Sequence, residues 1–255
     1  MKKILLSGVL AMSALAAPLH AAESGFLMEN PLLDSPIFGG NSNDDGTGAT
    51  ASLDNGGEFS FTPNVSTLGY GFDVGYKFNQ NLGVRGVYST YDWDGTYDYE
   101  GTDFNIDADF NSYGAMVDFH PFGGGLTIGV GARRNQSSVA MDAAFNGTFN
   151  YNGTTYTHPD DTVVNGEVTF PKWAPVVSVG YHGNIGDHVS FNFDLGAMHQ
   201  GAASIMMAAS GGVADDPSTS ASFRNEMEEQ RQNLEDELSE FKVYPIAKVG
   251  LSIRF

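Results

Sequence analysis

The sequence predicts an all-β protein: a transmembrane antiparallel β-barrel of eight strands, with an amphipathic helix in its last extracellular loop. Three features of the 255-residue chain predict this fold: an export signal, long stretches in which apolar and small residues alternate, and a final strand that ends on Phe255. Glycine is abundant, at 32 residues, and only 17% of residues are charged, as in barrels whose inner side is lined by small side chains.

The first 21 residues have the pattern of a secretory signal peptide. Lys2 and Lys3 precede an apolar run from Ile4 to Ala17, and a small residue, Ala21, closes the segment. The run is shorter than the roughly 20 apolar residues of a membrane-spanning helix, and no later stretch approaches that length. We therefore expect export, followed by an acidic N-terminal segment at 22–57 and a barrel at 58–255 that enters the membrane as strands.

Apolar residues at every second position predict seven strands. In the clearest stretch, Tyr70, Phe72 and Val74 alternate with glycines and Asp73. The seven predicted ranges are 66–78, 82–92, 110–120, 125–136, 174–182, 188–199 and 243–255. A soluble β-sandwich also alternates, but its second face would carry many charged side chains for water. Here that face is dominated by Gly and Ser, which favours the narrow lumen of a membrane barrel.

Turn lengths predict the direction of each strand. The connections at 79–81, 121–125 and 183–187 are short and belong on the periplasmic side, whereas the long polar connections belong outside. Bacterial single-chain barrels have an even number of strands, so an upward strand is missing before residue 66. We expect it between Gly25 and Leu53, with Asp54-Asn55-Gly56-Gly57 as a hairpin turn that leads into the second strand.

One segment follows the period of a helix. From Ser218 to Lys242 the chain lacks Gly and Pro, and its apolar residues fall at helical spacing. They are Phe223, Met227, Leu234, Leu238 and Phe241. Two interpretations of this amphipathic helix are open: it packs its apolar stripe on the barrel rim, or it binds a partner.

Seven charged residues have the inward parity of their strands. They are Asp73, Arg85, Asp118, Arg133, Asp194, Lys248 and Arg254. An eight-stranded barrel is just wide enough to be filled by side chains, and an unpaired buried ion is costly, so opposite charges should pair there. These residues are interpreted either as a salt-bridged plug or as a solute pathway.

The net charge of -19, with only 12 Lys and Arg, excludes nucleic acid as a partner. Many of the acids fall in the connections expected outside. We place an acidic extracellular rim at Asp92, Asp94, Asp98, Glu100, Asp103, Asp160 and Asp161. Such a rim raises the local concentration of cationic solutes, although acidic loops also simply keep a surface soluble.

No motif predicts a metal site, a cofactor or a catalytic centre. The chain has no Cys, which excludes thiolate chemistry and Cys-ligated metals. The stretch from Asn41 to Gly46 resembles a calcium loop, but Ser52 stands where a bidentate Glu is required. His199 is the one histidine placed as a general base, and no Ser and acid accompany it in a recognisable arrangement. We expect no enzyme, cofactor or metal.

Several short motifs together resemble a known family. The motifs are Gly166-Glu-Val-Thr-Phe170, Ala174-Pro175, Asp194-Leu-Gly196, Gln200-Gly201, Glu229-Gln-Arg231, Leu234-Glu-Asp236 and Tyr244-Pro245, with Thr67-Leu-Gly69 and His120-Pro-Phe-Gly123 earlier. They are similar to the small outer-membrane proteins related to the carbapenem-associated outer-membrane protein of Acinetobacter-type bacteria. The resemblance covers most of the chain after about residue 64. It implies an eight-stranded barrel and uptake of small basic amino acids such as ornithine.

The expectation from the sequence is a passive barrel in the outer membrane of a Gram-negative bacterium. It would be a narrow channel or binding protein for small solutes, preferably cationic. The alternative is a closed structural or adhesive barrel whose extracellular loops carry the function. Expected partners are outer-membrane lipid, small cationic solutes and the barrel-assembly machinery, which would recognise the strand ending in Phe255.

Overall fold

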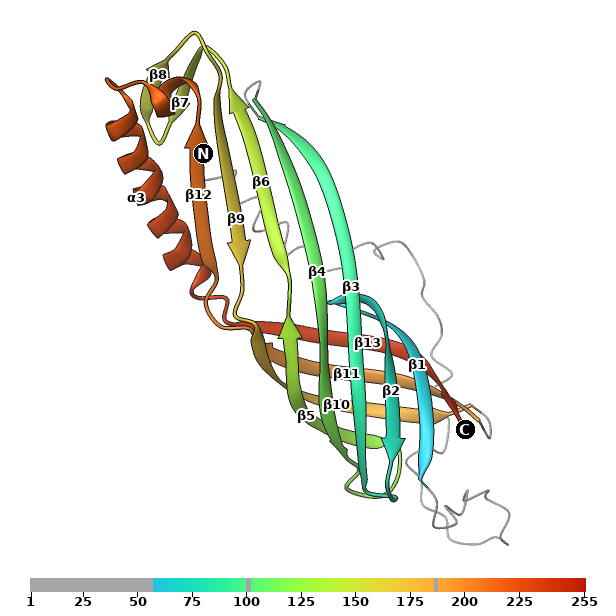
Figure 1. Cartoon of the computed structure of the whole chain (residues 1–255). Helices are drawn as coiled ribbons and strands as arrows, with labels where there is room; N and C mark the ends of the chain where they lie inside the picture. Colours follow the sequence, from blue (N-terminus) through green and yellow to red (C-terminus); the bar gives the residue numbers. More distant parts are fainter. Residues whose placement is uncertain (1–56, 100–101, 186–187) are drawn as a thin grey trace, which may run out of the picture.

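The computed structural model describes residues 57–99, 102–185 and 188–255 (Figure 1). The expected signal peptide, nearly all of the acidic N-terminal segment and Glu100 of the expected rim lie outside the described residues.

Eight antiparallel strands close into a barrel, as predicted. They are β1 (Glu58–Ser66), β2 (Gly69–Lys77), β3 (Leu82–Tyr99), β4 (Thr102–Phe119), β5 (Leu126–Asn135), β10 (Trp173–Asn184), β11 (Val189–His199) and β13 (Val243–Arg254). Strand β1 pairs with β13, and β5 pairs with both β4 and β10, which leaves the ring without an open edge. The three connections predicted to be short lie at one end of this ring, which we call the turn end.

The first strand of the barrel differs from the prediction. It is β1, which pairs with β2 over its whole length and with β13 to close the barrel. The strand that completes the ring therefore begins at Glu58 and not between Gly25 and Leu53, a segment that lies outside the described residues. A two-residue turn, Thr67 and Leu68, separates β1 from β2. Ser66 Oγ accepts a hydrogen bond from Leu68 N at 3.1 Å, and Gly69 adopts a φ of 102°, which favours glycine. The outward apolar residues of β1 are odd-numbered, as in Phe61 and Val65, whereas those of β2 are even-numbered, as in Tyr70 and Phe72. The alternation therefore changes phase at this short turn, and that change is the signal in the sequence that separates the two strands.

Three connections expected to be polar loops instead form an extension of the sheet. Strands β3 and β4 continue beyond the barrel as a long hairpin, and β6 (Ser138–Phe145), β9 (Thr162–Thr169) and β12 (Ser204–Ser210) pair beside them in that order (Figure 1). Strands β7 (Thr148–Tyr151) and β8 (Thr154–Thr157) form a separate hairpin. The opposite end of the barrel from the turns is therefore the extension end.

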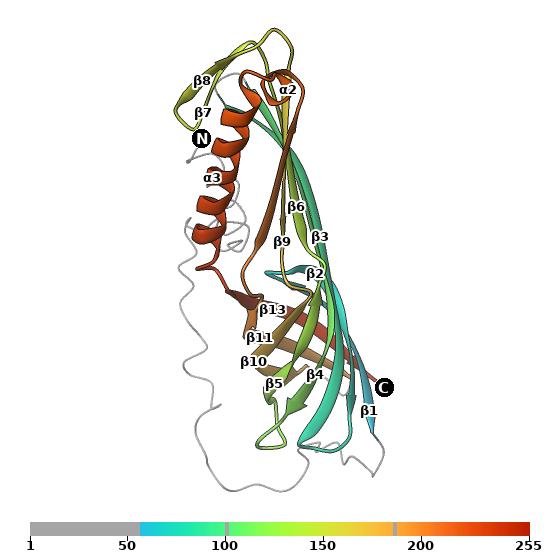
Figure 2. The ribbon, with the colours of Figure 1, turned by 60° about the vertical axis from the view of Figure 1, so that its left-hand side comes forward.

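The predicted helix is present in the last connection as α3 (Ser220–Leu238), after the short helix α2 (Gly212–Asp215). It runs along one face of the extension (Figure 2). Phe223 and Met227 pack in the cluster that includes Phe145 and Val164 of the extension. The apolar stripe is therefore covered by this chain's own extension rather than by the barrel rim. Phe241 lies beyond the end of α3 and is 56% exposed. Neither described helix is long and apolar enough to cross a membrane.

A band of exposed apolar side chains surrounds the barrel. It includes Phe72, Val74, Val84, Val117, Val130, Val177, Val179, Phe193, Leu195, Val249 and Leu251. Toward the extension, the outward positions change to Tyr88, Tyr113 and Trp173, and beyond these to Asp92 and Asp109. An apolar band bordered by aromatic residues is the outer surface of a membrane barrel.

A cation introduced into the middle of this band should destabilise the barrel. Val177 is 57% exposed and lies opposite Val130 and Ala197. Because a charge at the bilayer midplane is poorly solvated, Val177→Arg is expected to lower the free energy of unfolding by about 2–4 kcal/mol. Urea unfolding in lipid vesicles measures the effect, with Asp94→Arg on the extension as a control expected to change little. Equal stability of V177R and the parent would contradict the lipid-facing position of the band.

Candidate functional site

Five charged side chains meet in the barrel lumen and form what we call the ion cluster. Arg85 lies at its centre: Nε is 3.0 Å from Asp118 Oδ2, and Nη1 is 3.4 Å from Asp73 Oδ2 and 3.2 Å from Asp194 Oδ2. Lys248 Nζ is 3.0 Å from Asp194 Oδ2 and also pairs with Asp73. These side chains are nearly or fully buried, with exposed fractions between 3% and 11%.

The barrel brings these five residues together from five strands, β2, β3, β4, β11 and β13. Each lies at an inward position, and the wall around them is kept thin by glycine. A Cβ on Gly129 would lie 2.9 Å from Asp118 Oδ1, and one on Gly180 would overlap the Asp194 carboxylate. Three carboxylates and two cations leave the cluster slightly negative. Each charge compensates others in a space where a lone ion would be costly.

The other two charged residues expected in the lumen have different partners. Arg133 donates hydrogen bonds to Ser89 Oγ at 2.9 Å and to Ser112 Oγ at 3.0 Å, on the extension side of the ion cluster. Arg254 lies near the turn end, where its Nε is 3.4 Å from Glu58 Oε1. Of the seven predicted lumen residues, the structure therefore groups five in one network and places two apart.

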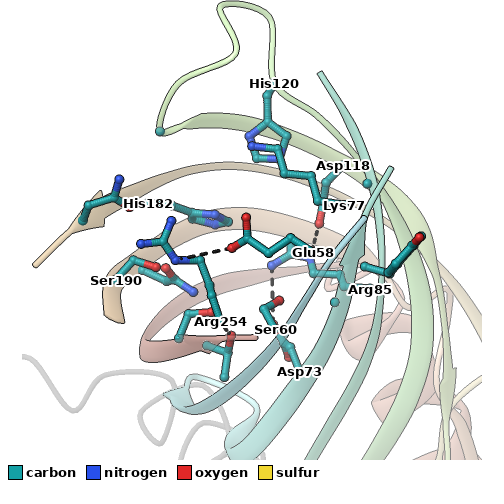
Figure 3. A pocket seen from close by; sticks show the side chains of 18 of the residues that line it. Glu58, Ser60, Asp73, Lys77, Arg85, Asp118, His120, His182, Ser190 and Arg254 are labelled. Carbon is teal, nitrogen blue, oxygen red and sulfur yellow. Dashed lines mark hydrogen bonds and ion pairs between the residues drawn. The ribbon is translucent and has the colours of Figure 1, made fainter. Parts of the chain in front are cut away.

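A cavity of about 1040 Å³ occupies the turn-end half of the lumen, and we call it the vestibule. Figure 3 shows Glu58, Lys77, His120 and His182 around it, together with Arg85 and Asp118 of the ion cluster. The rings of His120 and His182 are 6.0 Å apart. Glu58, Lys77, His120 and His182 are not among the seven residues that the strand parity predicts in the lumen. For Lys77 the signal was available, because it continues the inward parity of Asp73.

The extension end of the lumen is filled by apolar side chains, which we call the apolar plug. Val87, Met116, Val176, Met198 and Ile246 are buried there. Leu68 and Tyr244 pack against them. The second cavity, between this plug and the ion cluster, measures only about 20 Å³. In this structure the lumen is thus hollow and polar in one half and closed in the other.

The acidic residues expected at the rim lie on the outer surface instead of around the lumen. Asp92 and Asp94 lie opposite Asp109 and Asp107 in the β3–β4 hairpin, and Asp98 lies opposite Asp103. All of these side chains are exposed, on the face of the extension away from α3, and so are Asp160 and Asp161 between β8 and β9. None of them lines either cavity. Within the described residues, no group of three or more His, Asp or Glu is arranged to hold a metal ion.

A closed ring of eight antiparallel strands, an apolar outer band and a charged lumen define a transmembrane β-barrel. Two solved structures share this fold. The crystal structure of Acinetobacter baumannii CarO matches with a TM-score of 0.51 and 18% identity, over 77% of this chain and 97% of that one. The crystal structure of Acinetobacter baumannii CarO2 matches with a TM-score of 0.52 and 17% identity, over 78% and 98%. No protein-family model and no curated protein matches the sequence.

Proposed function

We propose that the protein is an outer-membrane barrel that admits small solutes, preferably cationic ones, through a gated lumen. The observation that carries this proposal is the vestibule of about 1040 Å³. An eight-stranded barrel can be filled by its own side chains, and a barrel used only as an anchor has no need of a hollow polar half. The proposal includes export by the N-terminal signal and insertion through the strand ending in Phe255.

The part of the vestibule beside the ion cluster, which we call its roof, favours cations. Asp118 Oδ1 and Asn192 Oδ1 are buried and accept no hydrogen bond from any described residue. Both residues line the vestibule beside the slightly negative ion cluster. An ammonium or guanidinium group carries several hydrogen-bond donors and a positive charge. With a small shift of the surrounding side chains, such a group would satisfy these two acceptors. The vestibule is also lined by Lys77, Arg85 and Arg254, which balance Glu58, Asp73 and Asp118, so the preference for cations rests on the two acceptors and not on the charge of the whole lining.

Passage across the barrel requires the ion cluster and the apolar plug to rearrange. Arg85 and Lys248 have long side chains, and the plug contains Met116 and Met198, whose unbranched side chains change rotamer readily. We therefore expect slow, solute-dependent flux rather than a steady open pore.

The test is solute uptake by vesicles that contain the purified full-length protein. We expect measurable influx of a small diamino acid, several-fold faster than influx of a neutral amino acid of the same size. Asp118→Asn should reduce this ratio several-fold, because it removes a carboxylate from the vestibule roof. Asp94→Asn, on the outer face of the extension, serves as the control and should leave the ratio unchanged. An unchanged ratio in D118N would contradict cation selection at the roof.

The second candidate is a closed barrel that anchors the extension and α3 at the cell surface. The observation in its favour is the apolar plug, which separates the two ends of the lumen. It predicts no solute flux in the parent protein. Absence of flux in vesicles that contain correctly folded barrel, checked by heat-modifiable gel migration, would establish this alternative over the channel.

A further inference from the structure

Arg134 has an unusual position for a cation in this barrel. It lies on β5 at the extension-end border of the apolar band, with Tyr113 of β4 on one side and Trp173 of β10 on the other. Within the described strands, it is the one Lys or Arg that faces outward. The others are Lys77, Arg85, Arg133, Lys248 and Arg254, which line the two cavities.

The guanidinium of Arg134 has no protein partner among the described residues. It forms no ion pair, and its Nε atom is buried without a hydrogen-bond acceptor. A buried donor without an acceptor costs free energy, and a shift of the Arg134 side chain toward a ligand that supplies acceptors would relieve this cost. The tryptophan ring has only a donor, and the row below consists of Ala115, Ala132 and Pro175. The phenol of Tyr113 could accept a hydrogen bond, but Arg134 Nε has no hydrogen-bond partner among the described residues.

The depth of Arg134 indicates which ligand would meet it. Tyr113 and Trp173 are 41% and 63% exposed, and such aromatic side chains lie at the level of the lipid headgroups. Lys172, which precedes Trp173, is also exposed, and its carbonyl oxygen accepts a hydrogen bond from Asn135 N at 2.9 Å. Two cations therefore lie close together at the membrane boundary of a chain with net charge -19.

We propose that Arg134, supported by Lys172, binds the phosphate group of a phosphorylated glycolipid in the outer leaflet. Guanidinium matches phosphate in charge and in the geometry of paired hydrogen bonds. On the outer surface beyond the apolar band, Asp92 and Asp109 would repel a phosphate from β3 and β4. A phosphate is therefore favoured beside Arg134 on β5. The inference rests on the proposed membrane location of the barrel and not on solute flux.

The test measures binding of lipid A to the purified full-length protein in detergent by native mass spectrometry. EDTA is present throughout, so that divalent cations cannot bridge phosphates to the acidic side chains. We expect Arg134→Gln to weaken binding of bis-phosphorylated lipid A about tenfold, a loss of about 1.4 kcal/mol. Arg134→Lys should retain part of the affinity. The control is Lys242→Gln, which removes an exposed cation next to β13 and should have no effect.

Two further binding measurements identify which group of the lipid Arg134 recognises. Fully dephosphorylated lipid A should bind the parent about as weakly as phosphorylated lipid A binds R134Q. Inorganic phosphate at millimolar concentration should not displace the lipid. Parent-like affinity in R134Q, equal binding of the dephosphorylated lipid, or displacement by inorganic phosphate would each overturn the proposal. Because solute uptake is measured separately, a failure here is distinguishable from a failure of the channel proposal.

Discussion

Arg85→Gln is expected to lower the free energy of unfolding by about 3–5 kcal/mol, because it removes one partner of a buried ion network. Arg85 lies within 3.4 Å of all three carboxylates of the ion cluster. Without it, Lys248 alone would face Asp73, Asp118 and Asp194 in a space closed to water on the extension side. The change is measured by unfolding the refolded protein with guanidinium chloride in detergent micelles.

Two companion variants separate a network effect from simple loss of a large side chain. Arg133→Gln removes a buried guanidinium that bonds only to neutral groups, Ser89 and Ser112, so it should cost less, about 1–3 kcal/mol. The double variant R85Q/D194N should be less destabilised than the sum of the single variants, since it removes a cation and an anion together. A loss below 1 kcal/mol in R85Q would show that the cluster does not hold the barrel together.

Phe223→Ala is expected to release α3 from the extension while the barrel remains folded. The Phe223 side chain is fully buried, and its ring lies 5.0 Å from that of Tyr151 and 5.2 Å from that of Tyr156. Removing a buried phenyl ring costs about 3–5 kcal/mol. This loss of packing free energy is large for α3, because the helix is held to the extension by one apolar face. Hydrogen exchange of α3 and of the β7–β8 hairpin should therefore increase by at least a hundredfold.

The comparison for this variant is Phe241→Ala. Phe241 is 56% exposed beyond the end of α3, so its removal should change exchange little. Heat-modifiable migration of both variants should match the parent, because barrel closure depends on the pairing of β1, β5 and β13 rather than on α3. Protection of α3 at parent level in F223A would show that the buried stripe does not hold the helix in place.

The seven strands predicted from alternation are present in the barrel because lipid and lumen impose opposite requirements on successive residues. In β13, Val249, Leu251 and Ile253 face outward while Lys248 and Ser252 face inward. The prediction placed the first strand too early for a local reason. The turn at Thr67 and Leu68 has only two residues and contains neither Gly nor Pro, so only the change from odd-numbered to even-numbered outward residues separates β1 from β2.

The extension was missed because its outer face is acidic instead of apolar. Asp92, Asp94 and Asp98 alternate with Trp93 and Tyr97, and so many carboxylates indicated a loop. Directly opposite aspartates are unfavourable in an isolated hairpin. Here the inner face, which packs in the same cluster as α3 through Phe104 and Phe223, provides the compensating apolar contacts. These contacts join segments more than a hundred residues apart, beyond the reach of a local pattern.

The amino-acid sequence by itself determined the class of fold, the outward band, the helix in the last connection and the inward parity of the charged residues, since each follows from a period along one segment. Only the tertiary structure decided which of those charges meet. Asp73, Arg85, Asp118, Asp194 and Lys248 lie at similar heights, whereas Arg133 and Arg254 do not. Height in the lumen depends on the stagger between paired strands, which is a property of the closed ring and not of any one strand.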